Sequence, residues 1–491
     1  MKALAMAALT VGMLAGAPGP KVVTLPGSSP LVTFRIVFLT GAAEDPAAKP
    51  GAAALTAAML ARGGTREMSY KQIVDALFPM AAAVADQTDK EMIVFTGTTH
   101  VDNLEAYYTL LRSMLLDPGW RKEDFERLRD DAVNFLQVSL AGNNDEELGK
   151  EVLYNAIYAG HPYGHDNVGT VSALKAMTIE DLQRFYKDHF TQANLVIGLA
   201  GGYPKGFAER VKADFSKLAA GTAKSGVVAE PKAIHGTHVT MVEKNTRSVA
   251  YSIGFPLDVR RGDADYPALL VAQSYFGQHR ESGGRLFARL REVRGLNYGD
   301  YAYIEYFPRG MFGFEPDPNL ARHRQIFQIW IRPVEPPTAQ FALRAAMFEL
   351  DKLVRDGLRA EDFERTRLFV GKYVNLLTKT KSAELGYRID SEFYGIPEYN
   401  TYLKQSLARL TVEDVNRAIR RHLRSTDLQV VVVAKDCAAL KTKLLANEVS
   451  PMKYNSPKPP EVMAEDKIIE RWPLDWKADD VRVVPVERVF E

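Results

Sequence analysis

The chain alternates between segments with the two-residue period of strands and segments with the period of helices. Strands are predicted where β-branched and other apolar residues alternate or cluster, at residues 31–39, 92–96, 194–199 and 428–433. Helices are predicted where apolar residues recur with a helical period or follow an N-capping residue, at residues 69–76, 101–116, 122–140, 146–158 and 178–189. This mixture of elements predicts an α+β fold.

Two short segments recur at nearly the same separation. The sequence Glu-Asp-Phe-Glu-Arg at residues 123–127 returns 238 residues later, at 361–365. The sequence Thr-x-Glu-Asp at residues 178–181 opens a helix that leads to a strand, and it returns 233 residues later, at 411–414. A repeat of this length indicates duplication of a whole domain rather than a solenoid unit. We therefore predict two homologous α+β domains, each an antiparallel-rich sheet packed with helices.

Changes in composition set the predicted boundaries. Residues 219–232 are rich in Ala, Gly, Lys and Thr and lack an apolar period, which predicts a linker between domains at 23–218 and 233–445. The tail, residues 446–491, is rich in proline and is expected to be extended. Residues 1–22 include an apolar stretch with one lysine and a small-residue end, which predicts a degenerate secretory signal and a periplasmic or secreted protein. An unstructured extension on a cytoplasmic protein stays open as the alternative.

Composition excludes several classes of function. The 491 residues are 46% hydrophobic, enough for the cores of more than one domain. The formal net charge of +1 gives no basic field for nucleic acid or an anionic membrane. The single cysteine, Cys437, excludes an internal disulfide and a cysteine-rich metal cluster. After the first 17 residues no apolar run is long enough to cross a bilayer.

The helix predicted at residues 51–60 is apolar on all sides, which predicts that it is buried. With its Pro-Gly start and Gly-Gly-Thr end, this stretch resembles the first helix of the M16 metallopeptidases, the pitrilysin, insulysin and mitochondrial processing peptidase family. In that family the helix carries the inverted motif His-x-x-Glu-His, whose histidines bind one zinc while the glutamate handles the attacking water. The matching positions here are Ala54, Ala57 and Ala58. A methyl group has no lone pair, so we expect no zinc in this chain.

The glutamate that the family places on a later helix as a zinc ligand is also missing. No glutamate lies between Glu126 and Glu146. Asp130 and Asp131 are available, but carboxylates without histidines make a poor zinc site. Loss of ligands at two separate places argues against a shifted alignment as the explanation.

Other candidate sites are weaker. His161 and His165 have the spacing of a metal pair, but the intervening Pro and Gly prevent the helix that would bring them together, so we expect a structural loop. The glycine-rich segment 198–206 lacks the Gly-Lys-Ser/Thr ending of a phosphate loop, which favours a tight strand–helix turn. Cys437 follows a strand and has no implied base, and the chain has no Gly-x-Ser-x-Gly elbow.

One functional element of the family is retained. Residues 284–298 resemble an M16 signature that supplies an arginine and, seven residues later, a tyrosine to hold the substrate backbone and the developing oxyanion. The matching positions are Arg291 and Tyr298. Both side chains can donate hydrogen bonds to a carbonyl oxygen that gains charge. The alternative is that Arg291 is a helix-end cation and Tyr298 a strand-core aromatic.

The resemblance covers residues 23–443 and implies a function. In several M16 assemblies one chain carries the zinc, and a sister chain without zinc contributes the arginine, the tyrosine and half of a peptide-holding chamber. We therefore expect a non-catalytic subunit of a heteromeric zinc endopeptidase, with the zinc in an M16 partner and a peptide or unfolded polypeptide as substrate. The alternative is a structural or peptide-binding protein comparable to the M16-like core subunits of respiratory complexes.

Overall fold

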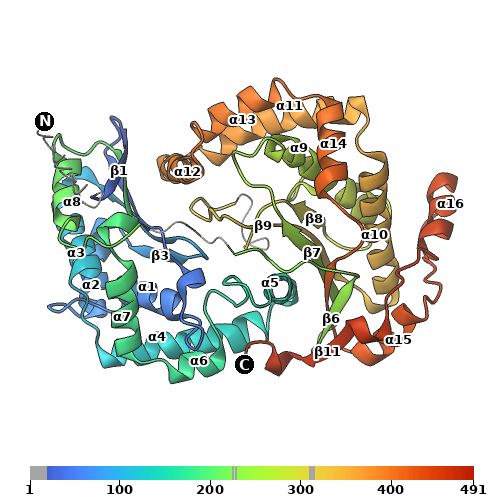
Figure 1. Ribbon diagram of the computed structural model, residues 1–491, viewed down its shortest axis with the longest axis horizontal. Coiled ribbons are helices and arrows are strands. Elements are labelled where there is room, and N and C mark those ends of the chain that lie inside the picture. Colours follow the sequence, from blue (N-terminus) through green and yellow to red (C-terminus); the bar gives the residue numbers. More distant parts are fainter. Residues whose placement is uncertain (1–18, 224–225, 227–228, 309–315) are drawn as a thin grey trace, which may run out of the picture.

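The computed structural model describes residues 19–223, 226, 229–308 and 316–491. Most of the predicted signal or extension at residues 1–22 lies outside the described residues. Figure 1 shows two α+β halves that face each other, the first in blue to green and the second in yellow-green to red. Within the described residues, no helix combines the length and the apolar character needed to cross a membrane.

The first half is built on a five-stranded sheet with the order β1-β5-β2-β4-β3. Only the β1–β5 pair is parallel. The strands are β1 (Lys21–Pro26), β2 (Leu31–Phe38), β3 (Ala85–Thr88), β4 (Ile93–His100) and β5 (Leu195–Gly201). The helices are α1 (Ala52–Arg62), α2 (Tyr70–Leu77), α3 (Leu104–Leu116), α4 (Lys122–Asn134), α5 (Asp145–Ile157), α6 (Val171–Ala176), α7 (Ile179–His189) and α8 (Phe207–Phe215).

The second half is built on a six-stranded sheet with the order β11-β6-β10-β7-β9-β8. The strands are β6 (His238–Glu243), β7 (Val249–Leu257), β8 (Asp300–Tyr303), β9 (Gln325–Val334), β10 (Gln429–Ala434) and β11 (Val481–Pro485). The helices are α9 (Tyr266–Gly277), α10 (Ala339–Asp356), α11 (Ala360–Leu377), α12 (Lys381–Tyr394), α13 (Tyr399–Leu407), α14 (Val412–His422), α15 (Cys437–Leu445) and α16 (Pro460–Ile469). The prediction of two α+β domains is confirmed.

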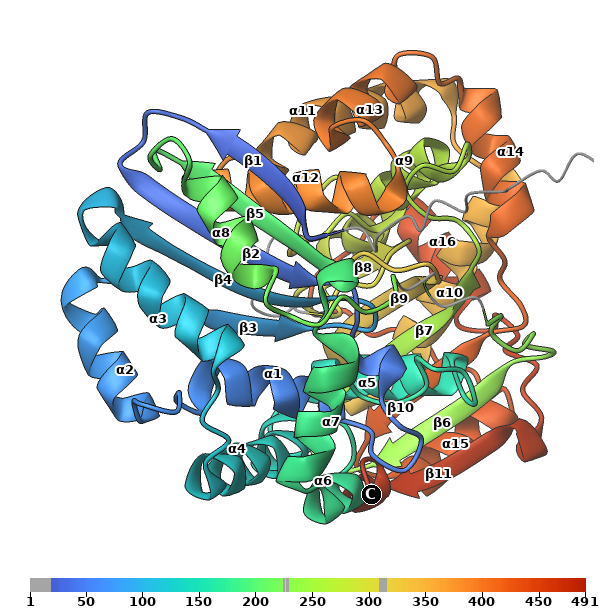
Figure 2. The ribbon, with the colours of Figure 1, turned by 60° about the vertical axis from the view of Figure 1, so that its left-hand side comes forward.

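Each half lends one helix to the sheet of the other. Helix α5 packs on β7, β10 and β9, whereas α12 packs on β5, β1 and β2. Figure 2 shows α12 running along the first sheet and α5 lying against the second. The two helices are equivalent, because each follows the helix that begins with the repeated Glu-Asp-Phe-Glu-Arg segment, α4 or α11. The exchange buries apolar residues of each half against the other, while most of the core of the second half is formed by its own residues.

The structure corrects two predictions of secondary structure. The single helix expected at residues 122–140 ends at Asn134 and continues as the π-helix η4 (Phe135–Leu140). The tail expected to be extended contains α16 and β11, which extends the second sheet by pairing in parallel with β6. Pro460 stands in the first turn of α16, where the missing N–H costs nothing because that turn has no internal acceptor. The tail then returns to the first half, where Phe490 is buried and its carbonyl accepts from the Val171 N–H.

Candidate functional site

Helix α1, which carries the positions of the lost zinc motif, is fixed at its N-terminus by Asp45. The two carboxylate oxygens of Asp45 accept from Gly51 N at 2.6 Å and Ala53 N at 2.7 Å, and a negative charge there also suits the helix dipole. His165 Nε2 lies 3.1 Å from the same carboxylate. Gly51 has φ 97°, and a Cβ there would lie 2.3 Å from Val168 O. The glycine before the lost motif is thus required by the backbone.

The residues at the three zinc-motif positions do not fit a metal ion. Ala57 and Ala58 are buried at 0% and 6% exposure, and Ala54 is partly exposed. A methyl group at each of these positions offers no lone pair to a metal ion. No group of three or more His, Cys, Asp or Glu side chains within the described residues is arranged to hold a metal.

The other candidate residues from the sequence lie at separate places in the structure. Asp130 and Asp131 are exposed on α4 and pair with Arg129 and Arg127 respectively. His161 Nδ1 accepts from Tyr163 N at 3.0 Å, away from the Asp45 contact of His165. Burial raises the pKa of the Cys437 thiol to about 12, which disfavours the thiolate. The segment 198–206 joins β5 to α8, and a Cβ on Gly201 would lie 1.8 Å from Leu31 O.

The Arg/Tyr element, residues 284–298, combines a π-helix with a tight turn. The π-helix η6 (Phe287–Glu292) is closed by Gly295, whose N–H donates to Arg291 O at 2.7 Å and whose φ is 69°. Asn297 holds the turn that follows. Its amide nitrogen donates to Asp300 Oδ1 at 2.7 Å and Arg332 O at 3.0 Å, and its amide oxygen accepts from Gly299 N at 3.2 Å. The backbone around Tyr298 is therefore fixed.

Arg291 and Tyr298 lie side by side on the surface. Tyr298 is 78% exposed, and Arg291 is also exposed. The guanidinium carbon of Arg291 lies 5.9 Å from the ring centroid of Tyr298 and 4.6 Å from the ring centroid of Phe287. Neither side chain makes a hydrogen bond or ion pair with any other described residue. Tyr298 is thus not a strand-core aromatic, because the Asn297–Gly299 turn carries it outward just before β8.

Asp300, which anchors this turn, predicts a pH dependence of stability. Burial raises its pKa to about 8, and its Oδ2 has no hydrogen-bond partner. The folded state therefore holds a proton that the unfolded state releases above pH ~4, so this residue lowers the free energy of unfolding as the pH rises from about 4 to 8. Between pH 5 and 8 the Asp300→Asn variant should lose less free energy of unfolding than the wild type. We expect this difference to reach up to ~3 kcal/mol. Urea unfolding of both proteins across this range is the measurement, and identical pH profiles would contradict the prediction.

A cavity of about 680 Å³ lies between the two halves. It is lined by β3, η4, α5 and the segments 306–308 and 317–320 of the second half. The lining side chains include Gln87, Thr88, Asp89, Phe135, Ser139, Glu147, Glu151, Asp166, Tyr306 and Asp317. This volume is in the range of ligand and peptide side-chain sites. Strand β3 is the edge of its sheet, and such an edge can pair with an extended chain where its outer backbone groups are free. One carbonyl of β3, Thr88 O, accepts from Asn167 Nδ2 at 3.3 Å.

The buried charges beside this cavity are partly neutralised. Burial raises the pKa of Glu151 and that of Asp166, which hydrogen-bond to each other. Burial, with the nearby Arg322 cation, lowers the pKa of Lys90 to about 8. Lys90 Nζ donates to His165 O at 2.5 Å. The carboxyl pair therefore favours holding a proton, and the cavity wall is less acidic than its composition indicates.

Buried polar contacts join the two halves at the same place. Arg322 Nε donates to Asp89 Oδ2 at 2.7 Å, and a second guanidinium nitrogen contacts the other carboxylate oxygen. Both side chains are almost completely buried, and the guanidinium lies 3.5 Å from the Tyr306 ring centroid. Gln87 on β3 also donates to Asn319 O at 3.2 Å. These contacts fix the edge strand relative to the second half.

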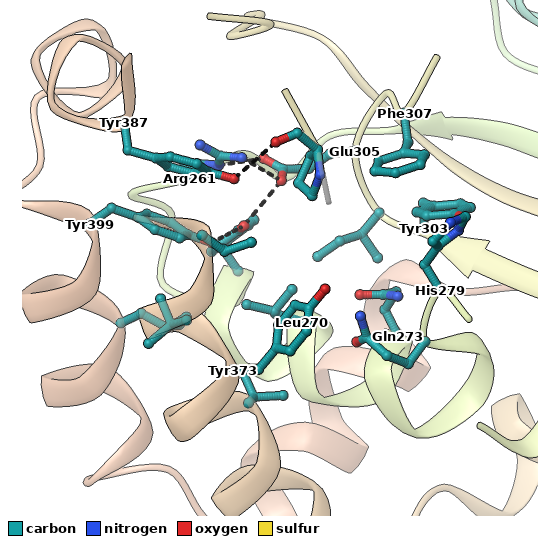
Figure 3. A pocket seen from close by; sticks show the side chains of 18 of the residues that line it. Arg261, Leu270, Gln273, His279, Tyr303, Glu305, Phe307, Tyr373, Tyr387 and Tyr399 are labelled. Carbon is teal, nitrogen blue, oxygen red and sulfur yellow. Dashed lines mark hydrogen bonds and ion pairs between the residues drawn. The ribbon is translucent and has the colours of Figure 1, made fainter. Parts of the chain in front are cut away.

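A second cavity lies inside the second half, between α9, α11, α13 and the segment after β8 (Figure 3). Figure 3 shows the Arg261–Glu305 ion pair at one side, next to Tyr387 and Tyr399, with Gln273 and His279 at the other. Its volume of about 90 Å³ is well below that of sites for peptides or drug-sized ligands. Of these two cavities, the larger one between the halves is the candidate for peptide binding.

Comparisons with known proteins agree with this architecture. The profile of the insulinase family (peptidase family M16) matches residues 21–171, and that of the peptidase M16 inactive domain matches residues 176–368. An uncharacterized zinc protease of Streptomyces coelicolor is 25% identical over 307 residues, which cover 59% of this chain and 66% of the relative. A probable mitochondrial-processing peptidase subunit beta of Arabidopsis thaliana is 25% identical over 224 residues, 45% of this chain and 42% of the relative. The matches thus span less than two thirds of either relative.

The fold is shared with solved structures. The crystal structure of a peptidase M16 inactive domain from Pseudomonas fluorescens superposes with a TM-score of 0.73 at 22% sequence identity. The superposition covers 84% of this chain and 95% of that structure. At this level of identity the likeness concerns the fold alone.

Proposed function

Because this chain belongs to peptidase family M16, we propose that it is the non-catalytic subunit of a heteromeric zinc endopeptidase. In this proposal the chain binds part of the peptide substrate and supplies Arg291 and Tyr298 to the active site of a partner. The partner is an M16 chain with an intact His-x-x-Glu-His motif, and the zinc is bound there. A periplasmic or secreted location, suggested by residues 1–22, belongs to the same proposal.

The exposure of Arg291 and Tyr298 carries this proposal. Two hydrogen-bond donors are held together at the surface by a rigid turn, and neither is used by another described residue. An exposed tyrosine and arginine with no internal partner add little to the stability of the chain that carries them. Placed against a second subunit, the same pair can donate to a substrate carbonyl oxygen that becomes negative during acyl transfer. The zinc-motif positions, by contrast, hold three methyl groups.

Peptide binding is supported by the cavity between the halves. Strand β3, the edge of its sheet, borders this cavity, and backbone groups on a sheet edge can pair with an extended peptide whatever its sequence. Phe135 from η4 adds an exposed apolar surface to the same wall. Support for a partner comes from the Arabidopsis relative, which is named as a subunit of a processing peptidase.

The proposal predicts that the isolated chain binds no zinc and cleaves no peptide. The reason is that Ala54, Ala57 and Ala58 provide neither ligands nor a base at the family's metal site. Elemental analysis of the purified chain after dialysis, together with an assay on a mixture of fluorogenic peptides, is the measurement. One zinc per chain that is lost on chelation, with peptide cleavage that is lost in parallel, would contradict the proposal.

A further inference from the structure

The Arg/Tyr element is held from behind by the C-terminal tail. Arg294, three residues after Arg291, has a fully buried side chain. Its Nε lies 2.8 Å from Asp466 Oδ1 and its Nη2 lies 2.7 Å from Glu465 Oε2, both on α16. A guanidinium between two carboxylates in these positions is held in one orientation by its planar fork of donors.

Two more arginines of the element, Arg285 and Arg289, face the same way as Arg294. Arg285 Nε lies 2.9 Å from Glu349 Oε2 and Arg289 Nε lies 3.2 Å from Glu349 Oε1, on α10. Arg289 also contacts the Glu465 carboxylate, and its carbonyl oxygen accepts from Arg294 Nη1 at 2.9 Å. Three of the four arginines in the element are therefore bound to carboxylates beneath it. Only Arg291 faces outward, together with Tyr298.

Helix α16 is itself firmly attached to the body of the second half. It packs on α10, as Figure 1 shows, and Val462 and Ile469 are buried. Arg344, with 0% exposure, donates to Glu470 O at 2.6 Å and to Glu448 O at 2.6 Å. Tyr454 Oη donates to Asp466 Oδ2 at 2.5 Å, which fixes the carboxylate that Arg294 uses. The tail is thus held on the second half by contacts that do not involve the Arg/Tyr element.

We infer that α16 sets the position of Arg291 and Tyr298, with Glu465 and Asp466 as positioning residues that act through Arg294. Both residues lie beyond residue 368, where the match to the family profiles ends. The effect on catalysis rests on the proposed function, whereas the attachment of the element to α16 does not. A displacement of about 1 Å in a positioned catalytic group is enough to cost ~10²-fold in rate.

The test is the full chain with Glu465→Gln and Asp466→Asn together, which keeps the shape of both side chains and removes both charges. In the isolated chain, we expect amide hydrogens of residues 287–296 to exchange at least ~10-fold faster while those of β6 and β10 are unchanged. In the complex with the zinc-bearing M16 partner, we expect kcat to fall ~10²-fold and KM to change less than about threefold. Glu461→Gln, on the same helix and without an ion pair to a described residue, is the matched control and should change neither quantity.

The single variant Glu465→Gln covers the case in which the double variant fails to fold, because Glu465 is 17% exposed and tolerates the change better. A variant with Asp466→Glu in place of Asp466→Asn keeps a carboxylate at this position. Slow exchange at residues 287–296 in that variant would support the inference. Unchanged exchange at residues 287–296 in a folded variant would overturn it. The charge-removing variant could show faster exchange but normal turnover, while Tyr298→Phe still lowers turnover. That result would overturn the positioning role. If Tyr298→Phe has no effect either, the proposed function is wrong and the exchange result alone supports the attachment.

Discussion

Replacing Tyr298 with phenylalanine is expected to lower the turnover of the reconstituted complex by ~10²–10³-fold, the usual cost of losing one donor to an oxyanion. The substitution removes only the hydroxyl, and that hydroxyl has no partner among the described residues. The ring keeps its place beside Arg291. Folding and assembly should therefore be unchanged. Arg291→Ala should lower turnover at least as much and also weaken peptide binding, because a second donor to the peptide backbone is lost.

The matched control for Arg291→Ala is Arg355→Ala. Arg355 is an exposed arginine at the end of α10 that pairs only with nearby carboxylates. Its loss should leave turnover unchanged, since exposed pairs of this kind contribute little to stability and Arg355 lies outside the Arg/Tyr element. Turnover within a factor of about two of wild type for both Tyr298→Phe and Arg291→Ala, in a complex shown to be assembled, would favour the structural-subunit alternative.

The second large effect concerns the buried link between the halves. Arg322→Met should lower the free energy of unfolding by about 3–5 kcal/mol, because Asp89 would remain completely buried without its cation. Asn167, whose amide donates to Asp89 at 3.2 Å, can satisfy only part of that carboxylate. Adding Asp89→Asn to Arg322→Met should recover a large part of the loss, since a neutral amide costs less to bury than an unpaired charge. Chemical denaturation of the three proteins is the measurement.

An exposed ion pair between the same two halves provides the comparison. Lys21 on β1 lies 2.6 Å from Glu392 on α12, and their side chains are 55% and 39% exposed. Lys21→Met should cost no more than about 1 kcal/mol. If Arg322→Met were as mild as Lys21→Met, the buried pair would not be what fixes β3 against the second half.

Much of the fold follows from local patterns in the sequence. The all-apolar run at residues 51–60 matches α1, and the strand-like runs match β2, β4, β5 and β10 closely, because burial of these segments is decided by their own residues. The duplicated segments locate α4 and α11. The exchange of α5 and α12 has no such signal, since an apolar helix face does not specify which sheet covers it. The proline-rich composition of the tail concealed α16, because proline is equally suited to an extended chain and to a first helical turn.

The site was predictable only in part. The spacing of Arg291 and Tyr298 marks the element, whereas their exposure depends on the turn made by Asn297 and Gly299. The Asp45 cap of α1 lies six residues before the glycine it binds, so no capping pattern reveals it. The Asp89–Arg322 pair joins residues 233 positions apart and has no local pattern at all. The sequence around Asp89 places three charged residues immediately before a predicted strand, which is a weak sign of a buried polar contact.

The most direct test of the proposed function is purification of the tagged full-length chain from its native cell, followed by native mass spectrometry and zinc analysis of the recovered complex. The proposal predicts a second M16 chain with an intact His-x-x-Glu-His motif, one zinc per pair of chains, and peptidase activity that disappears when the two chains are separated and returns on mixing. Recovery of this chain alone or only with copies of itself, or a partner whose activity is the same without it, would contradict the proposal.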